Sequence, residues 1–235
     1  MLVPFPINFP GLKTASSLKA IVLFIAVLLI ASMATLNAQN TTQILDPSAL
    51  KPPAGARVAI IEFYDLECPA CARANPTISA AAAKYKIPLV RHDFLIPGHV
   101  WSPQAALNAR WFDTKSKAIG EEYRNQVFAN QRSIYNLDTL RDFTNKFAQS
   151  HGLQLPFAID PQGTLAAAMK ADNDIGTRTG IRGTPGVFVA IANSKGAPYI
   201  EVHEIDKNLY QSIDQALSMA GPASSASSTK KPLQK

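Results

Sequence analysis

The chain is poor in cysteine: Cys68 and Cys71 are the only two among 235 residues. Disulfides that stabilise a fold join distant segments, because the stabilisation grows with the length of the closed loop. A structural zinc site would need four ligands, and the sequence has neither a second cysteine pair nor histidines at metal-like spacing. Covalent haem attachment is excluded because Ala72, not histidine, follows Cys71. The pair is therefore read as a redox couple, with an inert disulfide as the alternative.

Charged residues are also sparse, at 17%, and the net charge of +6 comes from the two ends of the chain. Lys13 and Lys19 lie near the start, and Lys230, Lys231 and Lys235 lie in the last six residues. The rest of the chain holds 18 basic and 17 acidic residues. No basic stripe with interleaved aromatic residues remains to follow a phosphate backbone, so no nucleic acid partner is expected.

One hydrophobic run is long, and it lies near the N-terminus. Residues 20–31 are all apolar, two lysines precede them, and Ala38 supplies a small residue at a cleavage position. This order is typical of a secretory signal peptide over residues 1–38. Because apolar residues continue to Leu36, an uncleaved N-terminal membrane anchor is the alternative. Residues 39–56 are interpreted as a linker and residues 221–235 as a disordered tail.

Between these ends the pattern predicts an α/β fold. The continuous apolar run from Val58 to Tyr64 is typical of a central strand, and it is followed by an alanine-rich helix at 69–86 and a second strand at 87–94. That βαβ order implies parallel pairing. We expect an α/β domain over 57–97 and 177–220, interrupted by a helical insertion over 98–176. The further predicted elements are helices at 103–114, 117–130, 137–151 and 162–175, a β-hairpin at 186–192 and 199–203, and a helix at 206–219.

The two cysteines occupy the place where the first strand gives way to a helix. Cys68 lies at the helix start, at the positive end of the helix dipole and close to free backbone N–H groups. Both features lower the pKa of a cysteine. Cys71, one turn later, lies deeper on the same helix face and suits a resolving thiol. Pro69 lies in the first helical turn, where its missing N–H costs nothing. This arrangement predicts thiol–disulfide exchange through a Cys68–Cys71 disulfide.

Two distant segments support that interpretation. Glu62 is an acid inside an otherwise apolar strand, where it either faces solvent or, if buried with a raised pKa, relays protons to Cys71. Gly183-Thr184-Pro185 comes just before a strand and suits a tight turn that exposes its backbone. His99 is a weaker candidate for the rim of the site.

With these residues in order, the chain resembles the DsbA-like thiol–disulfide oxidoreductases of the thioredoxin superfamily. The resemblance covers about 58–220 and includes Glu62, the Cys68–Cys71 pair, a kinking Pro76 and the Thr184-Pro185 dipeptide. It implies a thioredoxin fold with an inserted all-helical domain.

The resemblance also assigns roles to residues. Cys68 would be the exposed nucleophile, and Pro185 would be cis and face the disulfide. Thr184 would offer backbone hydrogen bonds to an extended substrate, with Pro69 and Ala70 also in contact with it. Strongly oxidising members often carry Pro-His between the cysteines, whereas this chain has Pro-Ala, so a more reducing potential than theirs is expected.

The sequence therefore predicts an exported, monomeric enzyme without a cofactor that exchanges disulfides with extracytoplasmic proteins. Its expected location is the periplasm or the extracytoplasmic face of the bacterial inner membrane. A membrane redox partner of the quinone-linked type would recycle it. Net oxidation of client thiols is expected. The alternatives are a reductase or isomerase fed by a membrane electron donor, and a peptide-binding chaperone or adaptor with a structural disulfide.

Overall fold

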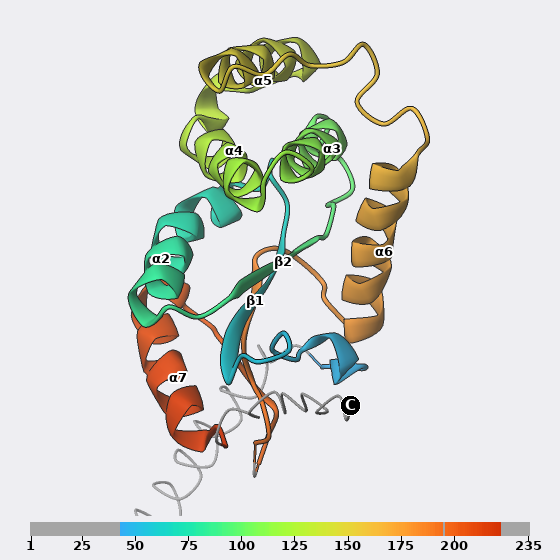
Figure 1. The fold of residues 1–235 in the computed structure, drawn as a ribbon. Helices are drawn as coiled ribbons and strands as arrows, with labels where there is room; N and C mark the ends of the chain where they lie inside the picture. Colours follow the sequence, from blue (N-terminus) through green and yellow to red (C-terminus); the bar gives the residue numbers. More distant parts are fainter. Residues whose placement is uncertain (1–42, 195, 222–235) are drawn as a thin grey trace, which may run out of the picture. The chain divides into compact units, whose positions relative to one another are not determined.

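A four-stranded sheet lies at the centre of the computed structural model, which describes residues 43–194 and 196–221 (Figure 1). Strand β1 (Val58–Tyr64) pairs in parallel with β2 (Leu89–Asp93) and antiparallel with β3 (Gly186–Ile191). Strand β4 (Tyr199–Glu201) continues the sheet beyond β3, giving the order β2-β1-β3-β4. All seven residues of β1 are buried, which confirms the predicted central strand.

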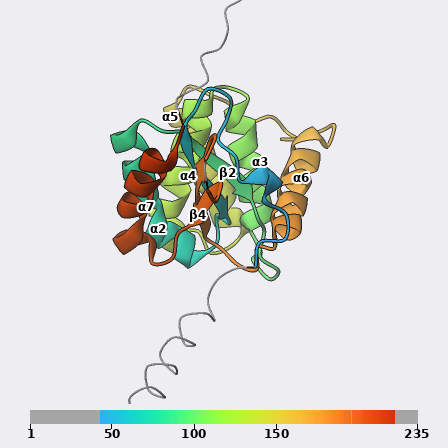
Figure 2. The same ribbon diagram turned by 90° about the horizontal axis from the view of Figure 1, so that it is seen from below.

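Helices cover both faces of the sheet (Figures 1 and 2). On one face lie α2 (Pro69–Tyr85) and α7 (Ile205–Met219), and on the other lie α6 (Thr164–Thr179) and the short helix η1 (Pro47–Ala49). Side chains alternate along a strand, so neighbouring residues of β1 enter different cores. Val58 and Ile60 pack with Leu209 of α7, whereas Ile61 and Phe63 face the side of α6.

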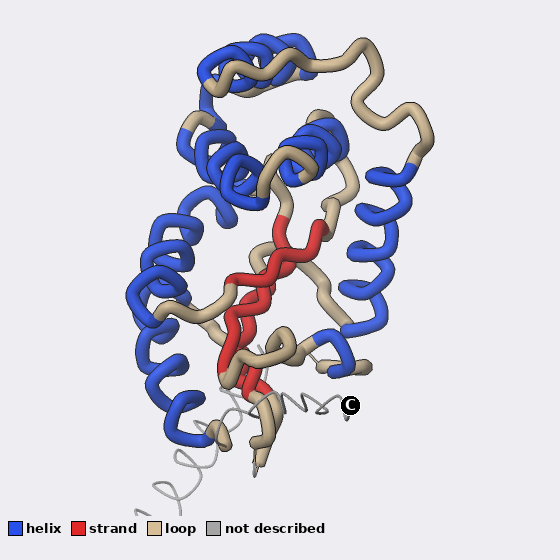
Figure 3. The backbone as a smooth tube through the Cα atoms, in the orientation of Figure 1, coloured by secondary structure: helices blue, strands red, loops and turns tan. Residues whose placement is uncertain are grey.

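Between β2 and β3 the chain forms a helical insertion at one end of the sheet (Figure 3). It contains α3 (Ser102–Asp113), α4 (Lys117–Ala129), the short helix η2 (Gln131–Ser133) and α5 (Leu137–Ser150). Its core includes the packed rings of Phe112, Tyr123 and Phe147. The expected fold class, a thioredoxin fold with a helical insertion, is confirmed, while the domain boundaries stay predictions.

Helix α6 ends later than the sequence suggested. The prediction stopped it at Ile175, before a glycine, but the helix continues through Gly176 to Thr179. A side chain at Gly176 would collide with the Phe94 ring, so glycine serves close packing there and does not end the helix. The helix ends at Gly180, whose φ of 94° is the left-handed conformation common after helix C-termini.

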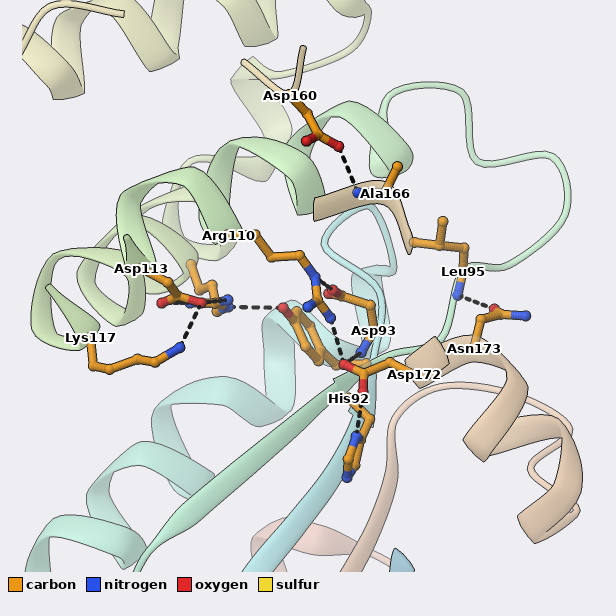
Figure 4. Close-up of polar contacts among 12 residues, drawn as sticks. His92, Asp93, Leu95, Arg110, Asp113, Lys117, Asp160, Ala166, Asp172 and Asn173 are labelled. Atoms are coloured by element: carbon orange, nitrogen blue, oxygen red, sulfur yellow. Dashed lines mark hydrogen bonds and ion pairs between the residues drawn. The ribbon is translucent and has the colours of Figure 1, made fainter. Parts of the chain in front are cut away.

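A polar network joins the end of β2 to α3 and α6 (Figure 4). Arg110 of α3 donates to Asp93 Oδ2 at 2.6 Å and to Asp172 Oδ2 at 2.5 Å. Asp172 of α6 also lies 2.8 Å from His92 Nδ1 and accepts the backbone N–H of Asp93 at 3.3 Å. These contacts connect both α3, the first helix of the insertion, and α6 to the end of β2.

Several predictions concern segments outside the described residues. The signal peptide or anchor over 1–38 lies there, as do the start of the 39–56 linker and nearly all of the 221–235 tail. Within residues 43–194 and 196–221, no helix combines the length and apolar character needed to cross a membrane.

Candidate active site

Cys68 is the residue immediately before α2, where the backbone is still extended. Its N–H donates to the carbonyl of Asp65 at 3.1 Å. The carboxylate of Asp65 in turn accepts the N–H of Glu67 at 2.7 Å and that of Ile96 at 2.8 Å. Pro69 follows as the first helical residue, as predicted from its missing donor. Asp65 therefore holds the loop before Cys68 by accepting main-chain N–H groups with its carbonyl and its carboxylate.

Donors around the Cys68 sulfur lower the pKa of this thiol to about 5. The largest contribution is a hydrogen bond from the Cys71 thiol, which outweighs the opposing effect of partial burial. Thr184 and the backbone N–H groups of Cys71 and Ala70 lower it further. Because the resulting pKa lies below 7, Cys68 is a thiolate at neutral pH, the form that attacks disulfides.

Cys71 lies one turn further along α2 and is 0% exposed. Burial is the main cause that raises the pKa of Cys71 far above its ordinary value, and the charges of Cys68 and Glu62 add to the effect. Both cysteines carry free thiols in this structure, so it represents the dithiol form. The two sulfurs thus differ strongly in acidity, with the more acidic one nearer the surface.

Glu62 is 0% exposed on β1, which excludes the interpretation that its side chain faces solvent. Its Oε2 accepts a hydrogen bond from Arg91 Nε at 2.7 Å. Arg91 also donates to Glu121 of α4 and, at 2.5 Å, to Asn75 Oδ1 of α2. Glu62 Oε1 has no hydrogen-bond partner among the described residues. The predicted acid therefore lies near Cys71, but it is held in an ion pair that sequence reasoning missed.

The loop before β3 closes the site from the opposite side. The Thr184–Pro185 peptide bond is cis, and Cys68 Sγ lies 3.3 Å from the Thr184 carbonyl, to which the protonated thiol donates. Thr184 Oγ1 is buried without a hydrogen-bond partner among the described residues, so its O–H is free to donate to a thiolate. The structure thus brings together Cys68, Cys71 and Thr184, with Pro185 adjacent and Pro69 and Ala70 opening the helix.

His99 is the remaining residue that the sequence placed near the site. His99 Nδ1 lies 3.0 Å from Asp65 Oδ2, outside hydrogen-bond geometry, and so borders the loop before Cys68. Within the described ranges, no three side chains of His, Cys, Asp or Glu gather as metal ligands would.

Comparisons with known proteins agree with this geometry. The chain matches the family described as Thioredoxin over residues 54–201. It belongs to the thioredoxin family. No curated protein matches the sequence at a significant level.

Solved structures show the same fold at low sequence identity. BdbD from Bacillus subtilis is 18% identical with a TM-score of 0.56, and the match covers 76% of this chain and 96% of that one. The thiol-disulfide exchange protein α-DsbA2 from Wolbachia pipientis is 15% identical with a TM-score of 0.56, covering 70% and 84%. ScsC from Proteus mirabilis is 14% identical with a TM-score of 0.57, covering 88% and 98%. The family match confirms the expected thioredoxin family, and these structures show that the expected fold is shared.

Two contributors to the site escaped sequence reasoning. Arg91 pairs with Glu62 because the two residues are direct partners across β1 and β2. A buried carboxylate needs a cation close to it, so an acid inside an apolar strand indicates a basic partner on a neighbouring strand. The sequence alone did not identify Arg91 as that partner, because the strand register was not known. Asp65 resembles any polar loop residue in the sequence, and only its hydrogen bonds reveal its role.

Proposed function

We propose that this protein is a thiol–disulfide oxidoreductase that exchanges disulfides with client proteins through Cys68 and Cys71. The observation that carries the proposal is the contrast between the two thiols. Cys68 has a pKa of about 5 at a helix start, whereas burial keeps Cys71 protonated. An acidic outer thiol paired with a protected inner thiol suits formation and resolution of a mixed disulfide.

In the oxidising direction the reaction starts from a Cys68–Cys71 disulfide. A client thiolate attacks the sulfur of Cys68, the Cys68–Cys71 bond breaks, and the Cys71 sulfur leaves with the electron pair and takes up a proton. A second client thiolate then attacks the client sulfur of the mixed disulfide and releases Cys68 as a thiolate. Two electrons pass from the client dithiol to the protein, and the client gains one disulfide.

The low pKa of Cys68 also supports net oxidation. A thiol with a lower pKa is the better leaving group, and a stabilised thiolate favours the reduced protein over its disulfide. Cys71 adds nothing to this effect, because its buried thiol stays protonated and gains no stabilisation from ionising. The Cys71 thiol, Thr184 and two backbone N–H groups partly replace the histidine that the Pro-Ala dipeptide lacks.

The reduction potential of the Cys68–Cys71 couple tests the direction. Equilibration with glutathione should give a value above about −150 mV for an oxidase, whereas about −270 mV, the range of thioredoxin, would indicate a reductase. A disulfide that resists reduction would favour a peptide-binding protein instead. Full exchange activity in a Cys68→Ser variant would contradict both enzymatic proposals, and a Cys71→Ser variant should accumulate the mixed disulfide with its client.

We also propose that the protein acts outside the cytoplasm and that a membrane protein recycles it. The sequence of residues 1–38 supports export, with the periplasm or the extracytoplasmic face of the inner membrane as the site of action. A membrane partner of the quinone-linked type would then reoxidise the Cys68–Cys71 pair, with the protein acting as a monomer. Fractionation of cells that produce the tagged chain tests export, and its recovery from the cytoplasm would contradict it.

A further inference from the structure

We propose that a pocket beside Cys68 selects client segments in which an aromatic or aliphatic side chain lies near the client cysteine and an acidic one lies next to it, on the side away from the cysteine. The pocket has a volume of about 530 Å³ and lies between the start of α2 and the connection from α4 to α5. Its walls include Glu67 and Pro69, the two sequence neighbours of the nucleophile. The inference rests on the proposed exchange function and adds a class of substrate to it.

The floor of the pocket is apolar. Trp101, Phe128 and Ile134 line it with exposed fractions of only 2%, 4% and 3%. These side chains belong to the same packed cluster as Cys68 and Cys71. A client side chain that enters the pocket is therefore in contact with apolar atoms close to the reacting sulfur. Its removal from water stabilises the complex in proportion to the apolar area that becomes buried.

The rim of the pocket is cationic. Arg73 of α2 and Arg132 of η2 are both exposed and line it. Within the described part of the chain, neither guanidinium has a carboxylate within 4.0 Å. Glu67 contributes the one carboxylate of the lining, and its Oε2 accepts the backbone N–H groups of Trp101 and Ser102 at 2.7 and 2.9 Å. Two arginines are thus left to attract an anionic group.

A mixed disulfide at Cys68 holds the client chain beside Glu67 and Pro69, which both line the pocket. An extended chain advances about 3.3 Å per residue, so residues two to four positions from the client cysteine lie about 7 to 13 Å away from it, and we place them over the pocket. Tyr135, which is 73% exposed, adds an aromatic surface at the outer edge. An apolar side chain on the floor and a carboxylate at the rim satisfy both parts of the pocket.

The experiment uses the full-length oxidised protein and short peptides with one cysteine. Each peptide carries Phe two residues from the cysteine and Glu, Gln or Lys three residues away, in one set on the N-terminal side and in another on the C-terminal side. Tryptophan fluorescence follows the second-order rate of reaction. In one of the two sets, we expect the Glu peptide to react about five-fold faster than the Lys peptide. A rate ratio of this size corresponds to the upper range of the stabilisation that an exposed ion pair gives. Phe→Ser in the peptide should lower the rate.

Variants locate the effect in the pocket. Arg73→Gln combined with Arg132→Gln should reduce the Glu-to-Lys rate ratio to about one. Arg141→Gln on α5 and Arg182→Gln, two residues before Thr184, each remove an exposed cation outside the pocket and should keep the five-fold ratio. Each rate is referred to that of dithiothreitol with the same variant, because this reagent reduces the same disulfide and has no chain to bind.

The outcomes separate this inference from the proposed function. Equal rates for the three peptides in both sets overturn it, as does an Arg182→Gln variant that loses the ratio as fully as the double variant. A dimer in sedimentation that the double variant dissociates would assign the pocket to a second copy of the chain and also overturn it. If neither dithiothreitol nor any peptide reduces the Cys68–Cys71 disulfide, the exchange function itself fails.

Discussion

At the scale of single residues, the acidity of Cys68 depends most on its neighbour Cys71. The Cys71 thiol is the largest cause of the lowered pKa, so replacing Cys71 by alanine removes the main donor. We expect the pKa of Cys68 to rise above 5 in Cys71→Ala. The absorbance of the thiolate at 240 nm, followed from pH 3 to 9, measures this. A Thr184→Val variant should show a smaller rise, and an unchanged midpoint in Cys71→Ala would contradict the assignment.

The same pKa predicts how the stability of the dithiol form depends on pH. The folded state releases the Cys68 proton near pH 5, whereas the unfolded chain keeps it until its ordinary value near 9.0. The free energy of unfolding of the reduced protein should therefore rise with pH from about 5 to 9, and this contribution is lost as pH falls through 5. The disulfide form lacks the titrating thiol. Urea unfolding of both forms at pH 4 and 7 gives the difference, and a reduced form favoured at the lower pH would refute the prediction.

The ion pair of Glu62 and Arg91 gives a second residue-scale prediction. Replacing Arg91 by methionine leaves a fully buried carboxylate without its cation, which costs about 3–5 kcal/mol in the free energy of unfolding. Combining Arg91→Met with Glu62→Gln removes the unpaired charge, so the double variant should be more stable than Arg91→Met alone. Urea denaturation of the four proteins forms the double-mutant cycle. Strictly additive losses would show that the pair is not coupled.

At the scale of secondary-structure elements, α6 depends on Gly176 for its approach to the sheet. A methyl group there would collide with the Phe94 ring and press on Phe63, so Gly176→Ala should destabilise the protein by about 1–3 kcal/mol despite its higher helix propensity. Thermal or urea unfolding measures the loss. Gly183→Ala is the matched control, since no atom lies within 4 Å of the methyl group it would add.

Elements with a clear local pattern were predictable from the sequence. The run Val58–Tyr64 is apolar throughout and forms a buried strand, and the Cys68-Pro69 step opens α2 because proline fits the first helical turn. Properties that depend on how elements meet were not predictable. The sequence did not reveal that Arg91 lies opposite Glu62, because that requires the strand register, nor that Gly176 lies inside a helix, because that requires the position of Phe94.

At the scale of the whole molecule, the network of Arg110 ties the insertion to the sheet. Asp93 is 2% exposed, so Arg110→Leu would leave a buried carboxylate without its cation and cost about 1.5–3 kcal/mol. Because Arg110 binds β2 and α6 together, we expect sheet and insertion to unfold in one transition in the native protein. Fluorescence of Trp101 and Trp111 reports on the insertion, and hydrogen exchange of β1 amides reports on the sheet.

Separate midpoints for the two probes in the native protein would show that the insertion unfolds independently. In Arg110→Leu the two midpoints should move apart, whereas Arg141→Gln on the exposed face of α5 should leave them together.

The groups that hold the Cys68 thiolate have a consequence for its response to ionic strength. Its principal stabilisers are a thiol, a threonine and backbone N–H groups, all of them dipoles and none an ion. Dissolved salt screens charges over a Debye length of about 10 Å at 0.1 M, but it hardly weakens hydrogen bonds in direct contact. The acidity of this cysteine should therefore be nearly the same in dilute buffer and in concentrated salt, which suits a protein proposed to work outside the cytoplasm, where the cell does not set the ionic composition.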